Sequence, residues 1–392
     1  MNQEFVNDFN QSYAKAHQLF EEQFWGTKMA LKDSGTYSVE LLSKTKADME
    51  NLLSDPKVLE DAQKYRDFLS DSGDNSSLCK TLDIIIKTCK CYDMSTNPEA
   101  RSIREQTVKL ESELGSARNN MKLGLYKSTD DSDAKIFEEI SSVGLRNIIR
   151  TSPDEKKRLS AYEGLRSIGP FVCANGFVEI VKLRNKLARA LGKEDYYEYK
   201  IQNSEGFSKS TLFEILDNLE IKTRDTLQNA RAELARRYGE TSLEPHNMSY
   251  MMRGSIVQKM DPYFPFGKAV ERYARSFAAM NIDYKGATLC LDLLDRKGKY
   301  SNGFCHWPVC AWEKPDGTFC PSKTNFTSLA DPAAVGSGMT ALTTLMHEAG
   351  HAAHFANVKQ PSPLFSQERA PTSVSYAGKF KYSVQVLSYF VL

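Results

Sequence analysis

Residues 345–354 read Leu-Met-His-Glu-Ala-Gly-His-Ala-Ala-His, and this stretch decides how the rest of the chain is interpreted. His347 and His351 are four residues apart, so on a helix their side chains stack on one face, about one turn apart. Two imidazoles placed in this way can hold one zinc ion. Glu348 then lies where it can take a proton from water activated by the metal. The stretch predicts a hydrolase with His347 and His351 as zinc ligands and Glu348 as catalytic base.

The pattern is specific because histidine is rare here, with six histidines among 392 residues. Chance placement of the five-residue pattern is on the order of one in a hundred for a chain of this length. The alternative is an ordinary helix whose histidines only pack. Apolar Leu342, Leu345 and Met346 favour a helix over 339–356 with one buried face. Small residues after Glu348 would let this helix pass close to its neighbours.

Two nearby residues are further candidates for the metal site. His354 lies seven residues after His347, near the same face but a turn further on. A packing role, or contact with a metal-binding side chain, is favoured for it over ligation. Glu368 is close enough in sequence to be a ligand candidate. Its neighbour Arg369 favours an ion pair or a loop anchor instead.

A short β-structure is expected just before the metal-binding helix. Residues 304–312 and 318–327 are β-prone and flank the turn signal Pro315-Asp316-Gly317. They predict an antiparallel hairpin, in which Pro308 and Pro321 take edge positions because proline cannot donate to a ladder. An extended peptide could add a strand to the edge of such a hairpin.

The rest of the chain is predicted to be mainly α-helical, one helix after another through the first half. Residues 70–77 form a polar loop, Leu191-Gly192 is a helix stop, and Ser208 starts a long helix. Residues 288–294 are expected to be a short strand or a turn of helix. Helices are expected over 13–23, 38–53, 58–69, 78–92, 98–122, 154–174, 176–191 and 211–238.

Composition excludes several function classes. Lysine and arginine number 51 and aspartate and glutamate 50, so the balanced charge predicts no nucleic acid and no membrane surface as partner. No segment reaches the roughly 18 continuous apolar residues of a spanning helix. The polar first 11 residues lack a signal-peptide pattern, and the eight cysteines lack a CxxC pair. These observations favour free thiols and a cytoplasmic location. A metal site at Cys89 and Cys91, or at Cys305 and Cys310, is the weaker alternative.

The motif and its surroundings resemble a known family. Residues 338–354 resemble the thimet oligopeptidase and oligoendopeptidase F family of zinc metallopeptidases, as does the following run 361–377, PSPLFSQERAPTSVSYA. Upstream, 183–200 is similar to a helical segment of that family, and Gly303-Phe304-Cys305 resembles its pre-hairpin stretch. The likeness covers about residues 1–377, and the zinc helix is its most specific part.

The resemblance implies a two-lobed helical oligopeptidase body with a deep channel. A narrow channel excludes folded proteins, so the implied substrates are short peptides. The implied cofactor is zinc, held by His347 and His351, with Glu348 as the base. The predicted regions are an N-terminal helical region over 1–200, an incomplete catalytic domain over 201–377 and a tail over 378–392 that does not match the family.

One position departs from the family pattern. The family completes its zinc site with the glutamate of a Tyr-Ala-Glu stretch, whereas this chain reads Tyr376-Ala377-Gly378. Gly378 has no side chain, and catalytic zinc normally has three protein ligands. The C-terminal helical region is also expected to be absent, together with the tyrosine and histidine that stabilise the oxyanion. Loss of that region would expose apolar helix faces.

The predicted function is zinc-dependent hydrolysis of internal peptide bonds in short oligopeptides. The alternative is a catalytically inactive truncated isoform or gene-model fragment that acts at most as a peptide-binding or regulatory protein. The missing glutamate at position 378 is the feature that separates the two.

Overall fold

The structure is a computed structural model that describes residues 2–31, 35–71, 77–94, 97–129 and 132–366. It is mainly α-helical with small sheets, which confirms the predicted fold class. Several of the expected helix starts have side-chain caps; Ser38, for example, accepts from the backbone N–H of Leu41, and Asn97 accepts from that of Ala100. The first five helices are α1 (Asn2–Lys28), α2 (Val39–Leu53), α3 (Pro56–Asp71), α4 (Ser77–Tyr92) and α5 (Pro98–Asn119).

The prediction of uninterrupted helices in the first half is wrong at one place. An antiparallel hairpin, β1 (Gly124–Thr129) with β2 (Ser132–Glu139), follows α5. Leu123 and Leu125 are buried two residues apart, the spacing of a strand with one face in the core. The rest of the segment mixes charged, polar and exposed apolar residues such as Tyr126 and Ile136, so it shows no clear alternation. The short helix α6 (Ser142–Thr151) follows the hairpin.

The helices expected over 154–174 and 176–191 are more broken than the sequence suggests. They form α7 (Glu155–Arg166), α8 (Ile168–Val172), a π-helical turn (Cys173–Phe177) and α9 (Val178–Ala190). Gly176 in the π-turn has φ 95°, a left-handed conformation that suits glycine and interrupts the helix. The remaining helices are α10 (Tyr196–Glu205), α11 (Lys209–Tyr238), α12 (Pro245–Met260) and α13 (Ala269–Ala279).

α11 is exposed over most of its length. Ser208 caps it as predicted, by accepting from the backbone N–H of Thr211. No residue of this helix is buried, although it carries several large apolar side chains. Leu219, Ile221 and Leu227 are about 60% exposed, at 57%, 62% and 62%. Because positions 219 and 221 point to opposite sides of a helix, these side chains are spread around α11 and do not form one apolar face.

The expected hairpin before the metal-binding helix is present and is part of a larger sheet. β4 (Phe304–Val309) pairs antiparallel with β7 (Lys323–Ala330), and β5 (Trp312–Glu313) pairs with β6 (Phe319–Cys320) around the predicted turn. β3 (Thr288–Leu294) adds on the far side of β7, and it runs parallel to it. The strand order β3-β7-β4 puts β4, which contains Pro308, at an edge as predicted.

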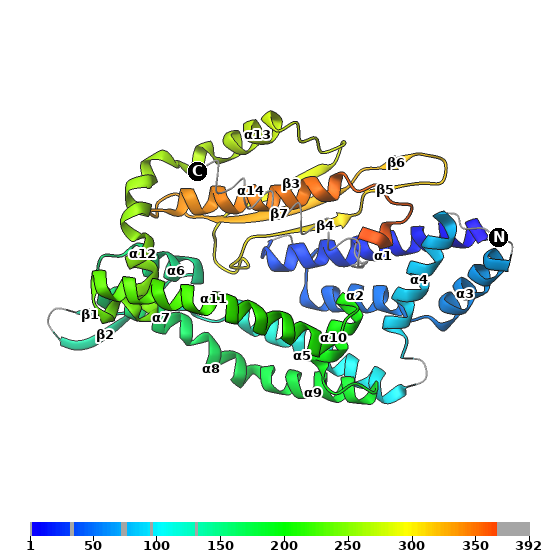
Figure 1. Cartoon of the computed structure of the whole chain (residues 1–392), viewed down its shortest axis with the longest axis horizontal. Helices are drawn as coiled ribbons and strands as arrows, with labels where there is room; N and C mark the ends of the chain where they lie inside the picture. The colour runs from blue at the N-terminus through cyan, green and yellow to red at the C-terminus, as the bar shows by residue number, and fades with distance from the viewer. Residues whose placement is uncertain (1, 32–34, 72–76, 95–96, 130–131, 367–392) are drawn as a thin grey trace.

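Two helices cover opposite faces of the sheet at β4. Cys305 and Phe326 belong to the core shared with α14 (Ser337–Ala356), the helix predicted over 339–356. His306 points the other way, as successive strand residues do, and its ring stacks on Trp25 of α1 at 5.2 Å. In Figure 1 the sheet, α13 and α14 form one group, and α5 with α8–α11 forms a second, with α6, α7 and α12 at one end.

α1 carries, on its side toward β4, a buried histidine that makes the free energy of unfolding depend on pH in the acid range. His17 is 2% exposed, and burial lowers its pKa to about 4, although Glu21 opposes the shift and His306 adds to it. The Glu21 carboxylate lies 3.8 Å from His17 and 2.7 Å from His306. The folded state therefore keeps His17 neutral at a pH where the unfolded chain protonates it.

We expect this histidine to reduce stability by about 2 kcal/mol between pH 7 and pH 5. The pKa of His17 in the folded state, about 4, lies below the ordinary 6.5. The free energy of unfolding is therefore undiminished by His17 above pH 6.5, and it falls as the pH drops from 6.5 toward 4. Urea unfolding of the unmodified chain and His17→Gln at both pH values measures the difference. Equal pH dependence in the two proteins would contradict this assignment.

Candidate functional site

The helix that carries the motif is held by apolar packing against the sheet. Leu342, Leu345 and Met346 are buried together with Phe326 of β7 and Phe277 of α13. The helix begins after Gly336, whose φ of 76° is left-handed and whose N–H donates to the Asp261 carboxylate at 2.6 Å. Because α14 is fixed at its start and along its apolar face, the histidine face has a defined position.

The structure brings the two predicted ligands together. The Nε2 atoms of His347 and His351 are 3.2 Å apart, and the two ring planes are inclined at 83°. Two nitrogens bound to one tetrahedral zinc at about 2.0–2.1 Å would be about 3.3–3.4 Å apart. The donor pair therefore fits a zinc-sized ion without a rearrangement of the helix.

Glu348 lies on the sheet-facing side of the same helix turn and is 6% exposed. A Cβ on Gly303, just before β4, would lie 3.4 Å from a Glu348 carboxylate oxygen and would clash with the Thr344 methyl. Burial, and then the nearby Glu348 carboxylate, raise the pKa of the Cys305 thiol well above its ordinary value. Glu348 is thus enclosed by the start of β4, and Gly303 gives it the room to lie there.

A tyrosine pair anchors α14 at the motif. The Tyr284 hydroxyl donates to the Ala349 carbonyl at 3.0 Å and accepts from the Tyr273 hydroxyl at 2.7 Å. Burial, and then the hydrogen bond from Tyr273, raise the pKa of Tyr284, so it stays protonated and able to donate. Ala349 itself is fully buried, in agreement with the expectation that small residues permit close packing here.

Tyr284→Phe is expected to lower the free energy of unfolding by about 1–2 kcal/mol. The change removes the donor to Ala349 and leaves the Tyr273 hydroxyl without its acceptor in a partly buried position. Tyr273→Phe is the matched control, because it keeps the bond to the helix carbonyl and should cost less. Chemical denaturation of the two variants gives both values, and a larger loss in the control would exclude this anchoring role.

His354 is the one other candidate ligand that the structure describes. His354 is half-buried with its ring 5.7 Å from that of Phe355, and burial lowers its pKa. Within the part of the chain that the structure describes, no group of three or more histidine, cysteine, aspartate or glutamate side chains could hold a metal ion. Glu368 and Gly378 lie outside the described residues, as does the tail after 377.

The sequence matches one family. Residues 149–375, which include the whole of α14, match the model of peptidase family M3. The chain belongs to peptidase family M3. No curated protein matches the sequence. No helix among the described residues of this M3 chain is both long and apolar enough to cross a membrane.

Solved structures similar to this M3 chain are also peptidases. Metallocarboxypeptidase 1 of Trypanosoma cruzi has a TM-score of 0.49 and 15% identity, over 94% of this chain and 57% of that chain. PZ peptidase A with inhibitor 2 has a TM-score of 0.45 and 15% identity, over 89% of this chain and 62% of that chain. The M3 chain thus spans about three fifths of the length of either protein.

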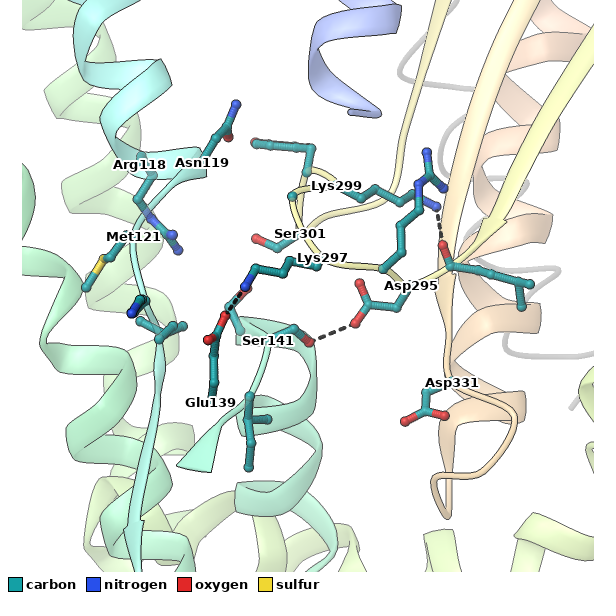
Figure 2. A pocket seen from close by; sticks show the side chains of 18 of the residues that line it. Arg118, Asn119, Met121, Glu139, Ser141, Asp295, Lys297, Lys299, Ser301 and Asp331 are labelled. Carbon is teal, nitrogen blue, oxygen red and sulfur yellow. Dashed lines mark hydrogen bonds and ion pairs between the residues drawn. The ribbon is translucent and has the colours of Figure 1, made fainter. Parts of the chain in front are cut away.

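The structure contains a cavity that the sequence did not predict. It has a volume of about 900 Å³ and is bounded by the end of α5, the β2–α6 junction, the 294–301 segment and the end of β7 (Figure 2). The 294–301 segment leads directly to Gly303 and Glu348. Lys299 fixes this segment, since its buried ammonium donates to the carbonyls of Asp292, Leu294 and Ser328 at 2.8–2.9 Å. The cavity therefore has a firm wall on the side of residues 294–301.

Proposed function

We propose that this M3 chain is a zinc-dependent endopeptidase that hydrolyses internal bonds of short oligopeptides, of the thimet oligopeptidase and oligoendopeptidase F type. The convergence of the two Nε2 atoms at 3.2 Å, beside a buried glutamate, is the observation that carries the proposal. Membership of a peptidase family supports it. The scattered spacing of the eight cysteines, without a CxxC pair, supports the cytoplasm as location.

In this proposal each motif residue has one role. His347 and His351 hold the metal through Nε2. A divalent metal, expected to be zinc, supplies Lewis acidity that makes water nucleophilic near neutral pH. The Glu348 carboxylate accepts a proton from the attacking water and then donates it to the nitrogen of the leaving amine. Its enclosure by β4 keeps the carboxylate oriented and limits its contact with bulk water.

The sheet edge offers a place for the peptide backbone. Among the described residues β4 pairs only with β7, so its other edge has no strand partner. An extended peptide added there would run beside the α14 face that carries Glu348, since Cys305 of β4 lies near that carboxylate. Main-chain hydrogen bonds do not depend on the side chains of the peptide, so this mode of binding would accept peptides of many sequences, as expected of an oligopeptidase.

The test is hydrolysis of an internally quenched oligopeptide by residues 1–392, with Glu348→Gln as the paired control. We expect cleavage that a chelator abolishes and that the control lowers by about 10²–10⁴-fold, the usual contribution of a general base. No cleavage above the control would exclude a working peptidase in this chain.

A second candidate function is peptide binding without catalysis. The absence of a third possible metal ligand within the described residues favours it, because catalytic zinc normally has three protein ligands. This candidate would be supported if the unmodified chain and Glu348→Gln both bind the peptide and neither protein hydrolyses it.

A further inference from the structure

A second cavity, the helical cavity, lies among α2, α4, α5, α9 and α10 and shares no residue with the 345–354 motif. Figure 1 shows α2, α5 and α9 one beside the other, and α10 packs against α9. The helical cavity has a volume of about 520 Å³. Ligand pockets usually measure about 300–1,000 Å³. It is therefore large enough for a small organic molecule.

The helices turn polar side chains into this cavity. α5 contributes Arg104 and Glu111, which are seven residues apart and so lie on one face of the helix. α10 contributes Tyr196, Tyr199 and Lys200, which are three and four residues apart. Helix faces that meet inside a bundle are normally apolar. Packing of the helices alone does not account for this lining.

Positive charge exceeds negative charge on the wall. The charged side chains there are Lys46, Arg104, Arg184 and Lys200 against Glu50 and Glu111. Glu111 is shared by two cations, since it lies 2.6 Å from Arg184 and 3.8 Å from Lys46. Lys200 forms no ion pair within the residues that the structure describes. Two positive charges are thus left over at a partly buried position, where an anion would offset them.

The two guanidinium groups each keep one edge free. Arg104 contacts Glu50 through Nε at 3.2 Å and Nη2 at 2.9 Å. Arg184 contacts Glu111 in the same way, through Nε at 3.0 Å and Nη2 at 2.6 Å. Among the described residues neither Nη1 atom has an acceptor. The glutamates therefore hold the arginines in place and leave N–H donors for a ligand.

Tyrosine rings also fix the two arginines. The guanidinium of Arg104 lies 5.0 Å from the ring centre of Tyr92, and that of Arg184 lies 5.2 Å from the ring centre of Tyr196. The rings of Tyr196 and Tyr199 are 5.8 Å apart. Burial raises the pKa of both of these tyrosines, so their hydroxyls stay protonated. The site is arranged before a ligand arrives, which lowers the entropy cost of binding.

We propose that the helical cavity binds a small organic dianion, a phosphate monoester or a dicarboxylate, through Arg104, Arg184 and Lys200. The charge of such a ligand matches the excess on the wall, since a phosphate monoester carries about −1.5 to −2 at pH 7. Guanidinium groups suit it because their N–H donors form a fork that matches phosphate and carboxylate oxygens. The tyrosine rings offer apolar surface to its organic part. The proposal is independent of the proposed peptidase activity.

The first test measures affinity on the full chain by isothermal titration calorimetry. The probes are phenyl phosphate and glutarate as dianions, benzoate as a monoanion and benzyl alcohol as a neutral molecule. We expect at least one dianion to bind about tenfold more tightly than benzoate, the gain from one further charge-assisted contact. Benzyl alcohol should bind more weakly than benzoate. Tighter binding of phenyl phosphate assigns the site to phosphate monoesters, and tighter binding of glutarate assigns it to dicarboxylates.

The second test locates the bound dianion through a cysteine of the wall. Cys91 lines the helical cavity, whereas Cys173 is exposed and lies outside it. Alkylation of both thiols by iodoacetamide is followed by mass spectrometry of the peptides. A saturating concentration of the tighter dianion should slow the alkylation of Cys91 by about tenfold, in proportion to the occupied fraction of the site, and leave Cys173 unchanged.

Substitutions then identify the contacts. Lys200→Gln should weaken dianion binding by about tenfold, as loss of one charge-assisted contact does. Lys222→Gln is the matched control, because Lys222 is an exposed lysine of α11 and its loss changes the net charge equally. Arg184→Gln should weaken binding to a similar extent. If Arg184→Gln does not fold, Lys200→Gln decides, since Lys200 is exposed and forms no ion pair within the described residues.

Three results would overturn the proposal. The first is that neither dianion binds more tightly than benzoate. The second is a dianion affinity that Lys200→Gln lowers no more than Lys222→Gln does. The third is binding of a dianion without protection of Cys91, which would place the ligand outside the helical cavity. Loss of peptide hydrolysis in Glu348→Gln has no bearing on any of these measurements, so the two proposals can fail separately.

Discussion

His351→Asn is expected to weaken zinc binding by at least about 100-fold, more than loss of a group that only orients a ligand. The reason is the geometry of the donor pair, whose Nε2 atoms are 3.2 Å apart and converge on one point. At a free zinc concentration 100 times the Kd of the unmodified chain, binding stabilises the fold by about 2.7 kcal/mol. After a 100-fold loss of affinity the same concentration gives about 0.4 kcal/mol. The zinc-induced rise in Tm should therefore nearly disappear.

His354→Asn is the matched control for this measurement. His354 is on the same helix and near the same face, and its ring lies 5.7 Å from that of Phe355. A packing role predicts no loss of zinc binding. Thermal unfolding with zinc and with chelator should give the full rise in Tm for this variant. An equal loss of the rise in both variants would show that His354 binds the metal. A full rise in His351→Asn would exclude the pair as the zinc site.

The helix α14 could be predicted from the sequence because its information is local. The helical period alone places His347 and His351 one turn apart, and the structure has them adjacent. The β4–β7 pairing was predictable for the same reason, since a turn signal joins two nearby β-prone runs. The parallel pairing of β3 with β7 was not, because it links strands separated by the whole hairpin and leaves no local pattern.

The cavity lay beyond sequence reasoning for a related reason. Its walls come from the end of α5, the β2–α6 junction and residues 294–301, which lie far apart in the sequence. No spacing rule joins such segments, and a charged residue such as Arg118 has, in isolation, the pattern of a solvated helix residue. The hairpin β1–β2, between α5 and α6, was itself missed. Charged side chains that come together from distant segments can be recognised as a group only in the structure.

A glycine at the start of α14 gives the largest expected effect on stability. A Cβ on Gly338 would overlap the backbone carbonyl of Phe264, and its other near neighbours, at 3.1 and 3.4 Å, are backbone atoms too. A side chain could rotate away, but here a backbone segment packed against α14 would have to move. Gly338→Ala is therefore expected to lower the free energy of unfolding by about 2–3 kcal/mol, the cost of overpacking a tight contact.

Gly115→Ala provides a control of opposite sign. Gly115 lies inside α5, and an added Cβ meets no atom within 4 Å. Alanine there should stabilise the fold by about 0.5–1 kcal/mol, because it reduces the freedom of the unfolded chain. Urea denaturation of the two variants should give shifts in opposite directions. A small or stabilising effect of Gly338→Ala would mean that α14 does not lie against Phe264, and the position of Glu348 beside β4 would then need another support.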